Sequence, residues 1–248
     1  KVESGCMETL FLPIAGFLIA LLLVILFYSK KRIKNEETTI YSSMLITNLI
    51  FSMLAIIIYV YAKTVGNELI ISVIQKIYLL LMLYIVLNIA LYNISLLRLS
   101  SKVKITIHNF LYLSYTIFSL LTLLTPLNVI NEGNVLDGNG LSINILLIGV
   151  GIYFIFILIT SIMIFTKKTV QVTKDLPFVV LIVLYTLGLI LRTYIPSVIF
   201  ETFFFSFTLL IMYHTIENPD LKIIGELNLA KETAERANRA KSDFLSSM

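Results

Sequence analysis

Long apolar runs recur along the chain, and they constrain its fold more than any other feature. Hydrophobic residues make up 58% of the sequence and charged residues 14%, whereas an ordinary soluble domain is about 45–50% apolar. A helix needs roughly 20 mostly apolar residues to cross the hydrocarbon layer of a bilayer. The runs therefore predict an all-α membrane protein whose first partner is the lipid bilayer.

Seven segments are long and apolar enough, or nearly so, to cross a membrane. They are Leu10 to Tyr28, Ile40 to Tyr61, Ile77 to Leu97, Phe110 to Leu124, Ile143 to Phe165, Leu176 to Leu191 and Tyr194 to Tyr213. Only Arg192 and Thr193 join the last two, so a re-entrant hairpin remains an alternative to two full crossings. We predict a seven-helix transmembrane domain over residues 10–213, preceded by an extracellular N-terminus over residues 1–9.

The basic residues predict the orientation of the bundle. Those that follow the first, third and fifth segments are Lys30, Lys31, Arg32, Lys34, Arg98, Lys102, Lys104, Lys167, Lys168 and Lys174. The connections on the other side hold only Lys1, Lys63, Lys76 and Arg192. Since basic loops stay on the cytoplasmic side of a membrane, we expect the N-terminus outside, the C-terminus inside, and residues 128–140 in an extracellular connection.

The first residues permit two interpretations. Met7 is a possible translation start, and the first apolar run competes with a secretory signal peptide. No small-residue cleavage site follows that run, and its basic flank comes after it instead of before it, so we expect a first spanning helix. Cys6 is the only cysteine, which excludes an intrachain disulfide and a multi-cysteine metal site.

A polar linker and a charged helix follow the bundle. Residues 214–222 contain Pro219 and predict a break between helices. Apolar or small residues then recur at alternating spacings of three and four, which is typical of a coiled-coil seam. The seam residues are Ile223, Leu227, Ala230, Ala234, Ala237, Lys241, Phe244 and Met248. The pattern predicts a cytoplasmic signalling helix over residues 223–248 that pairs in a homodimer, and the alternative is an exposed solvated helix.

The last nine residues carry the strongest resemblance to a known family. The run from Ala240 to Met248 reads A-K-S-D-F-L-S-S-M, and it resembles the A-K-S-x-F-L-x-x-M segment that leads into S-H-E-I-R-T-P in bacterial sensor histidine kinases. The helix count and the exit from Glu217 to Lys222 resemble the seven-transmembrane sensor region found on some of these proteins. The resemblance implies a multi-pass signal-input region in a bacterial plasma membrane, ending just before the phosphoacceptor histidine.

The same resemblance implies the chemistry of a part beyond Met248. A dimerisation and kinase domain would bind ATP and Mg²⁺, autophosphorylate on histidine, and pass the phosphoryl group to an aspartate of a response regulator. We expect no cofactor, no metal, no catalytic residue and no nucleic-acid partner for the chain itself, which has no glycine-rich phosphate loop and no nucleophile–base spacing. His214 and His108 stand too early to be the phosphoacceptor, so we interpret both as interfacial or packing residues.

Polar residues inside the apolar segments are the candidates for binding an unidentified ligand. They are Asn48, Tyr84, Asn88 and Tyr92, with Arg192 and Glu201 near the outer ends of the last two segments. Polar residues in membrane helices mark functional sites, but they also serve as interhelical hydrogen bonds. Snorkelling to the interface likewise explains Arg192 and Glu201.

Two other classes of function compete with this interpretation. In a polytopic transporter or channel the polar residues would line a path, but internal repeats and paired broken helices are not evident. A receptor with another cytoplasmic output, such as a cyclic-nucleotide enzyme, would use a similar helical linker, and the terminal A-K-S-D-F-L-S-S-M run argues against it. The sequence identifies neither the stimulus nor the sign of the response.

Overall fold

The computed structural model describes residues 2–30, 35–97, 99–132, 135–166, 176–195 and 198–247. Within these ranges the chain forms eight helices and one two-stranded hairpin. The helices are α1 (Val2–Ser29), α2 (Glu36–Thr64), α3 (Glu68–Leu96), α4 (Ser101–Leu124), α5 (Leu141–Thr166), α6 (Leu176–Tyr194), α7 (Glu201–Thr215) and α8 (Pro219–Ser247). The hairpin consists of β1 (Asn128–Glu132) and β2 (Val135–Asn139).

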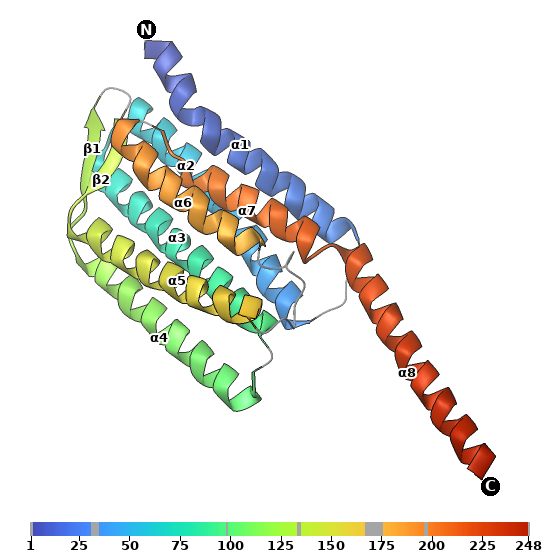
Figure 1. The fold of residues 1–248 in the computed structure, drawn as a ribbon. Coiled ribbons are helices and arrows are strands. Elements are labelled where there is room, and N and C mark those ends of the chain that lie inside the picture. Colours follow the sequence, from blue (N-terminus) through green and yellow to red (C-terminus); the bar gives the residue numbers. More distant parts are fainter. Residues whose placement is uncertain are drawn as a thin grey trace.

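Helices α1 to α7 lie side by side in one bundle, and α8 projects from the end of the bundle opposite the N-terminus (Figure 1). α3 occupies the centre, where it contacts α2, α4 and α5, and its residues from Ile85 to Ile94 are all buried. α4 lies at the edge, and Leu111 and Thr122 are its only buried residues. α7 packs between α1 and α6 and also contacts α2.

Asparagine side chains cap the starts of α2 and α3. Asn35 Oδ1 accepts a hydrogen bond of 2.7 Å from the Thr38 amide at the start of α2, and Asn67 Oδ1 accepts one of 3.1 Å from the Leu69 amide at the start of α3. Such caps satisfy backbone donors that have no partner within the helix. Gly66, with a φ of 70°, turns the chain between α2 and α3.

Within the described residues, five helices are long and apolar enough to cross a membrane: α1 to α5. The apolar part of α6, Pro177–Leu191, is shorter. α7 has 15 residues and rises about 22 Å at 1.5 Å per residue, less than the roughly 30 Å of hydrocarbon. The chain is thus a helical protein with the features of a membrane protein. Helix length supports five crossings, and the expected crossings by α6 and α7 belong to a proposal made below.

Several boundaries differ from those expected from the sequence. Tyr194 is the last residue of α6, and α7 begins only at Glu201, so the seventh apolar run is not one helix from its first residue. Residues 2–9 continue α1 instead of forming a separate N-terminal segment. α8 begins at Pro219, inside the expected linker, because proline is well suited to the first turn of a helix, where its missing N–H is not needed.

The β-hairpin is an element that the sequence pattern did not predict. β1 and β2 pair antiparallel, with Asn128 opposite Asn139 and Glu132 opposite Val135. Gly140 follows with a φ of 122°, and a Cβ there would lie 2.9 Å from the Pro126 carbonyl oxygen. The hairpin lies at the end of the bundle away from α8, against α3 and α5 (Figure 1). We call this end the hairpin end and the other the α8 end.

Candidate functional site

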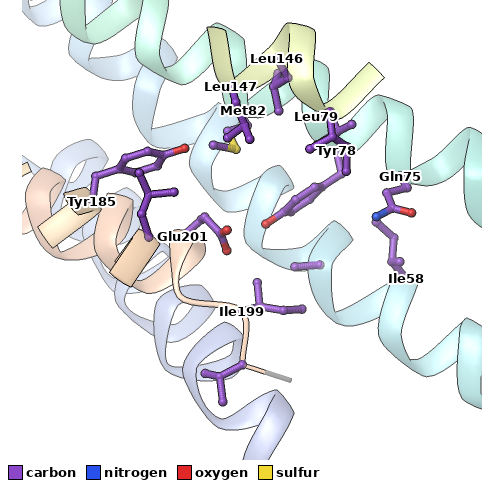
Figure 2. A pocket seen from close by; sticks show the side chains of 14 residues that line it. Ile58, Gln75, Tyr78, Leu79, Met82, Leu146, Leu147, Tyr185, Ile199 and Glu201 are labelled. Atoms are coloured by element: carbon purple, nitrogen blue, oxygen red, sulfur yellow. The ribbon is translucent and has the colours of Figure 1, made fainter. Parts of the chain in front are cut away.

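A cavity of about 90 Å³ lies at the hairpin end, between α2, α3, α5, α6 and the start of α7 (Figure 2). Ten of its fourteen lining residues are apolar, among them Ala55, Met82 and Leu147. The other four are Gln75, Tyr78, Tyr185 and Glu201. An apolar cavity with a few polar groups is the usual form of a small-molecule site, so this is the candidate site for a stimulus.

Glu201 stands at the first position of α7 and is half-buried. Its carboxylate extends into the space between the rings of Tyr185 and Tyr78 (Figure 2). A carboxylate in the first turn of a helix is stabilised by the helix dipole, which accounts for its position at the α7 start. Of the six predicted ligand residues, Glu201 is the one whose side chain lines the cavity within the described part of the chain.

Gln75 supplies a second polar group and connects the cavity to the hairpin. The residue is 9% exposed, and its Oε1 atom has no hydrogen-bond partner among the described residues. A Cβ on Gly138 of β2 would lie 2.7 Å from Gln75 Nε2 and 2.7 Å from Ile143 Cδ1, so a larger residue there would displace the ends of these two side chains. Sequence reasoning missed Gln75, Tyr78 and Tyr185, although the period of the α3 helix places Gln75, Tyr78 and Met82 on one face.

Three other predicted ligand residues lie in contacts within and between helices. Asn48 Nδ2 donates a 2.8 Å hydrogen bond to Ser206 Oγ, which donates in turn to the Gly16 carbonyl at 2.8 Å, so one chain of bonds joins α2, α7 and α1. The Tyr84 hydroxyl lies 3.3 Å from Ser43 Oγ of α2. Asn88 Nδ2 donates to the carbonyl of Tyr84, one turn earlier, at 2.8 Å.

Gly16 makes the contact between α1 and α7 possible. A Cβ at this position would lie 2.9 Å from both the carbonyl carbon and the carbonyl oxygen of Thr202. Backbones therefore meet there without an intervening side chain, as small residues allow in membrane helices. This close approach holds the start of α7 next to α1.

Tyr92 lies far from the cavity, at the α8 end, and bonds to the linker before α8. Its hydroxyl donates a 2.5 Å hydrogen bond to Glu217 Oε1, and both residues are 0% exposed. The Tyr92 ring packs against the rings of Tyr41 and Phe178, with centroids 6.5 Å and 6.4 Å away. The Glu217 amide donates to the Met212 carbonyl of α7 at 3.0 Å. Glu217 thus ties the junction of α7 and α8 to the central helix α3.

Asn93, the next residue of α3, makes a second buried polar contact that sequence reasoning missed. Its Nδ2 lies 3.0 Å from Thr160 Oγ1 and 3.0 Å from Ser161 Oγ, and 3.1 Å from the Ile157 carbonyl, all on α5. The contact fastens α3 to α5.

The two histidines lie near the α8 end. His108 Nε2 is 3.8 Å from Glu36 Oε1, and Lys104 Nζ is 2.5 Å from Glu36 Oε2. His214 is exposed and packs edge-on against Tyr213, with ring centroids 5.5 Å apart. Both positions are compatible with interfacial residues.

α8 is exposed wherever its side chains are described. Leu227, Ala230, Ala234, Ala237 and Lys241 of the predicted seam are exposed in the single chain, and the side chains of Ile223 and Phe244 and the whole of Met248 lie outside the described residues. The pairs Glu232–Arg236 and Glu235–Arg239 approach to 3.7 Å and 3.8 Å, in the order that favours a helix. The coiled coil stays a prediction.

Arg192 belongs to α6, but its side chain lies outside the described residues, so its expected contact with Glu201 also stays a prediction. Within the described ranges, no group of three or more His, Cys, Asp or Glu side chains could hold a metal ion.

No family model matches this chain, and no curated protein matches it either.

Proposed function

We propose that this chain is the membrane sensor and signal-input region of a two-component sensor histidine kinase. In this proposal α1 to α7 make seven crossings, with the hairpin end outside a bacterial cell and the α8 end in the cytoplasm. The short α7 completes its crossing with residues 198–200, which precede it. The support is the resemblance of the run from Ala240 to Met248 and the way in which α8 leaves the bundle.

The observation that carries the proposal is the hydrogen bond between Tyr92 and Glu217. Glu217 lies two residues before α8, and its partner lies on the buried central helix. A change in the packing of α6 and α7 against α3 therefore has a direct route to the start of α8.

The proposed signal is a rotation or register shift of α8 within a homodimer. The residues from Ile223 to Met248 pair with those of a second copy, and the small alanines make that pairing marginal, because buried alanines remove little apolar surface from water. A marginal seam suits a helix that must change its register. To switch the output from about 1:99 to 99:1, the stimulus must favour one packing by roughly 5.5 kcal/mol.

The enzymatic part of the proposal lies beyond this chain. The residues after Met248 would bind ATP and Mg²⁺, accept the phosphoryl group on histidine, and transfer it to a response regulator. The chain described here would supply the stimulus and the dimeric arrangement.

The direct test is to express the protein with the coding sequence that follows Met248 in its gene, reconstitute it in nanodiscs, and incubate it with radiolabelled ATP. We expect an acid-labile label that disappears when the first histidine after Met248 is changed to glutamine. A different downstream domain, or a reading frame that ends at Met248, would overturn the proposal and favour a stand-alone receptor or transporter.

Replacing both Ala234 and Ala237 by leucine tests the proposed seam. The added apolar surface should stabilise one register, so the kinase output should become constant at one level and insensitive to the stimulus. Arg236→Leu, on the same helix but outside the seam, is the matched control. A stimulus response that survives the double replacement unchanged would defeat the seam model.

A further inference from the structure

The cavity at the hairpin end has the size and chemistry of a ligand site. An apolar protein cavity of about 150 Å³ accommodates benzene, with its six carbon atoms. By proportion, the 90 Å³ here accommodates about four non-hydrogen atoms. The natural occupant of the cavity is therefore a small molecule or the end of a longer one.

Two of the four polar residues that line the cavity, Gln75 and Glu201, offer acceptor oxygens to a hydrogen-bond donor, and the hydroxyls of Tyr78 and Tyr185 can both donate and accept. Gln75 Oε1 is buried and has no partner among the described residues, and a buried carbonyl oxygen is costly to leave without a donor. The Glu201 carboxylate offers further acceptor sites, because its two oxygens accept about four hydrogen bonds in all. That capacity leaves room for a ligand in addition to the contacts that Glu201 already makes within the chain.

The apolar walls select for a short hydrocarbon body next to that donor. Ala55 and Met82 face the cavity from α2 and α3, and Leu147 and Leu189 face it from α5 and α6. A carboxylate head group is disfavoured, since it would approach the Glu201 carboxylate in a space of low polarity, where like charges repel strongly.

The cavity also lies where a ligand can act on the proposed signal. Val198, Ile199 and Glu201, which line it, form the connection from α6 to α7 and the first residue of α7. Gln75 and Tyr78 belong to α3, the helix that carries Tyr92. An occupant would brace the start of α7 against α3, at the end of α7 opposite to Glu217.

We propose that this cavity binds a small molecule with a short apolar body and a hydrogen-bond-donating head group, of the primary amine or alcohol class. Its role as the stimulus rests on the proposed function, whereas binding itself is a property of this chain. The head group donates to Gln75 Oε1 and to Glu201, and the hydrocarbon body contacts the leucine and methionine side chains.

The experiment uses the chain in nanodiscs and three probes that each have three carbon atoms: 1-propylamine, 1-propanol and propionate. Saturation-transfer difference NMR measures binding, and empty nanodiscs correct for partition into lipid. We expect saturable binding of the amine and the alcohol, with dissociation constants on the order of millimolar for ligands of about four non-hydrogen atoms, and no saturable binding of propionate.

Three variants locate the binding. Ala55→Leu fills the cavity and should weaken both ligands at least tenfold, Glu201→Gln should weaken the amine more than the alcohol, and Glu68→Gln should change neither. Glu68 is the matched control, because it is an exposed carboxylate at the same end of α3 and does not line the cavity. Equal loss of both ligands in Glu201→Gln would assign a neutral donor head group to the natural ligand and would still support the site.

Other outcomes overturn the proposal. Saturable binding of propionate, unchanged binding in Ala55→Leu, or the absence of saturable binding of all three probes each contradicts the site. These results are independent of the kinase assay: binding without a histidine-linked label supports the site and contradicts the proposed function, and the label without binding does the reverse.

Discussion

The two ends of the bundle differ in the contacts that lie between their helices, although each holds a buried side-chain oxygen without a hydrogen-bond partner among the described residues: Asn93 Oδ1 at the α8 end and Gln75 Oε1 at the hairpin end. At the α8 end, the Tyr92 hydroxyl and Glu217 bond to each other while fully buried, and Asn93 fastens α3 to α5. At the hairpin end, Gln75 Oε1 has no partner among the described residues, and a cavity of about 90 Å³ separates the helices. The difference indicates that buried hydrogen bonds fasten α3 to its neighbours at the α8 end, whereas the helices at the hairpin end leave space for an occupant.

The contrast also explains the placement of the short helix α7. Its first residue, Glu201, lines the cavity, whereas Glu217, two residues beyond its last, bonds to Tyr92. α7 thus connects the loosely packed end to the fastened end over 15 residues. If the comparison is right, substitutions at the α8 end should affect stability most, and those at the hairpin end should affect binding.

The largest effect on stability is expected for Tyr92→Phe. The change removes the donor to a buried carboxylate, and a hydrogen bond to a charged group contributes about 1.5–3 kcal/mol. We expect a loss of about 2–3 kcal/mol in SDS-induced unfolding followed by circular dichroism. Tyr41→Phe is the control, since the Tyr41 hydroxyl donates to the backbone carbonyl of Leu209 and should be worth less. Equal losses of stability in Tyr92→Phe and Tyr41→Phe would mean that the bond to Glu217 contributes no more than an ordinary bond to a backbone carbonyl.

Asn93→Ala should follow, with a loss of about 1–2 kcal/mol in the same assay, because membrane interhelical hydrogen bonds reach about 1.7 kcal/mol. Thr160 remains bonded to the carbonyl of Phe156, so its hydroxyl stays satisfied and the loss should not be larger. Asn88→Ala is the matched control, since Asn88 bonds within its own helix. A loss as small as that of the control would show that α3 and α5 are held by packing alone.

Glu201→Gln should cost less than about 1 kcal/mol, because the residue is half-buried at a helix start and partly exposed ion pairs and charges contribute little. The unfolding assay gives the stability, and the binding assay with 1-propylamine gives the functional effect. If the two ends differ as described, the loss of stability should be small and the loss of 1-propylamine binding should be large. A large loss of stability without any change in binding would make Glu201 a structural residue and would contradict the comparison.

The smallest effect is expected for Glu232→Ala on α8. An exposed i, i+4 pair contributes about 0.2–0.5 kcal/mol, and Arg236 is 83% exposed. We expect the helix content of α8 and the unfolding midpoint of the bundle to stay within error of the unchanged protein. A cooperative loss of the bundle would mean that α8 belongs to the folded core.

The sequence predicts the apolar helices well, because length and hydropathy alone decide which runs can span a membrane. It predicts the first and last residues of the helices poorly. Tyr194 is the last residue of α6, but hydropathy assigned it to the start of the seventh apolar run. The sequence pattern therefore placed Tyr194 in one helix with residues of α7, which begins only at Glu201. The hairpin was missed because the glycines and asparagines from Asn131 to Gly140 are equally typical of an open loop, and β1 and β2 have only five residues each.

The candidate site was predictable in part. Glu201 stands out as a carboxylate next to an apolar run, and the structure places it in the cavity. Tyr92 was selected as a polar residue on α3, but its partner Glu217 lies 125 residues away, and no local pattern contains such a contact. Gln75 was missed because its burial depends on Gly138 of the hairpin, which the sequence did not predict.

The central claim is that Glu217 couples the bundle to α8 through Tyr92, and one distance tests it most directly. Spin labels at Lys102→Cys and Asn238→Cys, both exposed positions and the second outside the proposed seam, are introduced into a Cys6→Ser background, which removes the single native thiol. Pulsed electron paramagnetic resonance, with unlabelled protein in excess, then gives the distance distribution within one chain. The account predicts a narrow distribution that broadens or shifts in Tyr92→Phe and stays narrow in Tyr41→Phe. An identical distribution in all three proteins would contradict it.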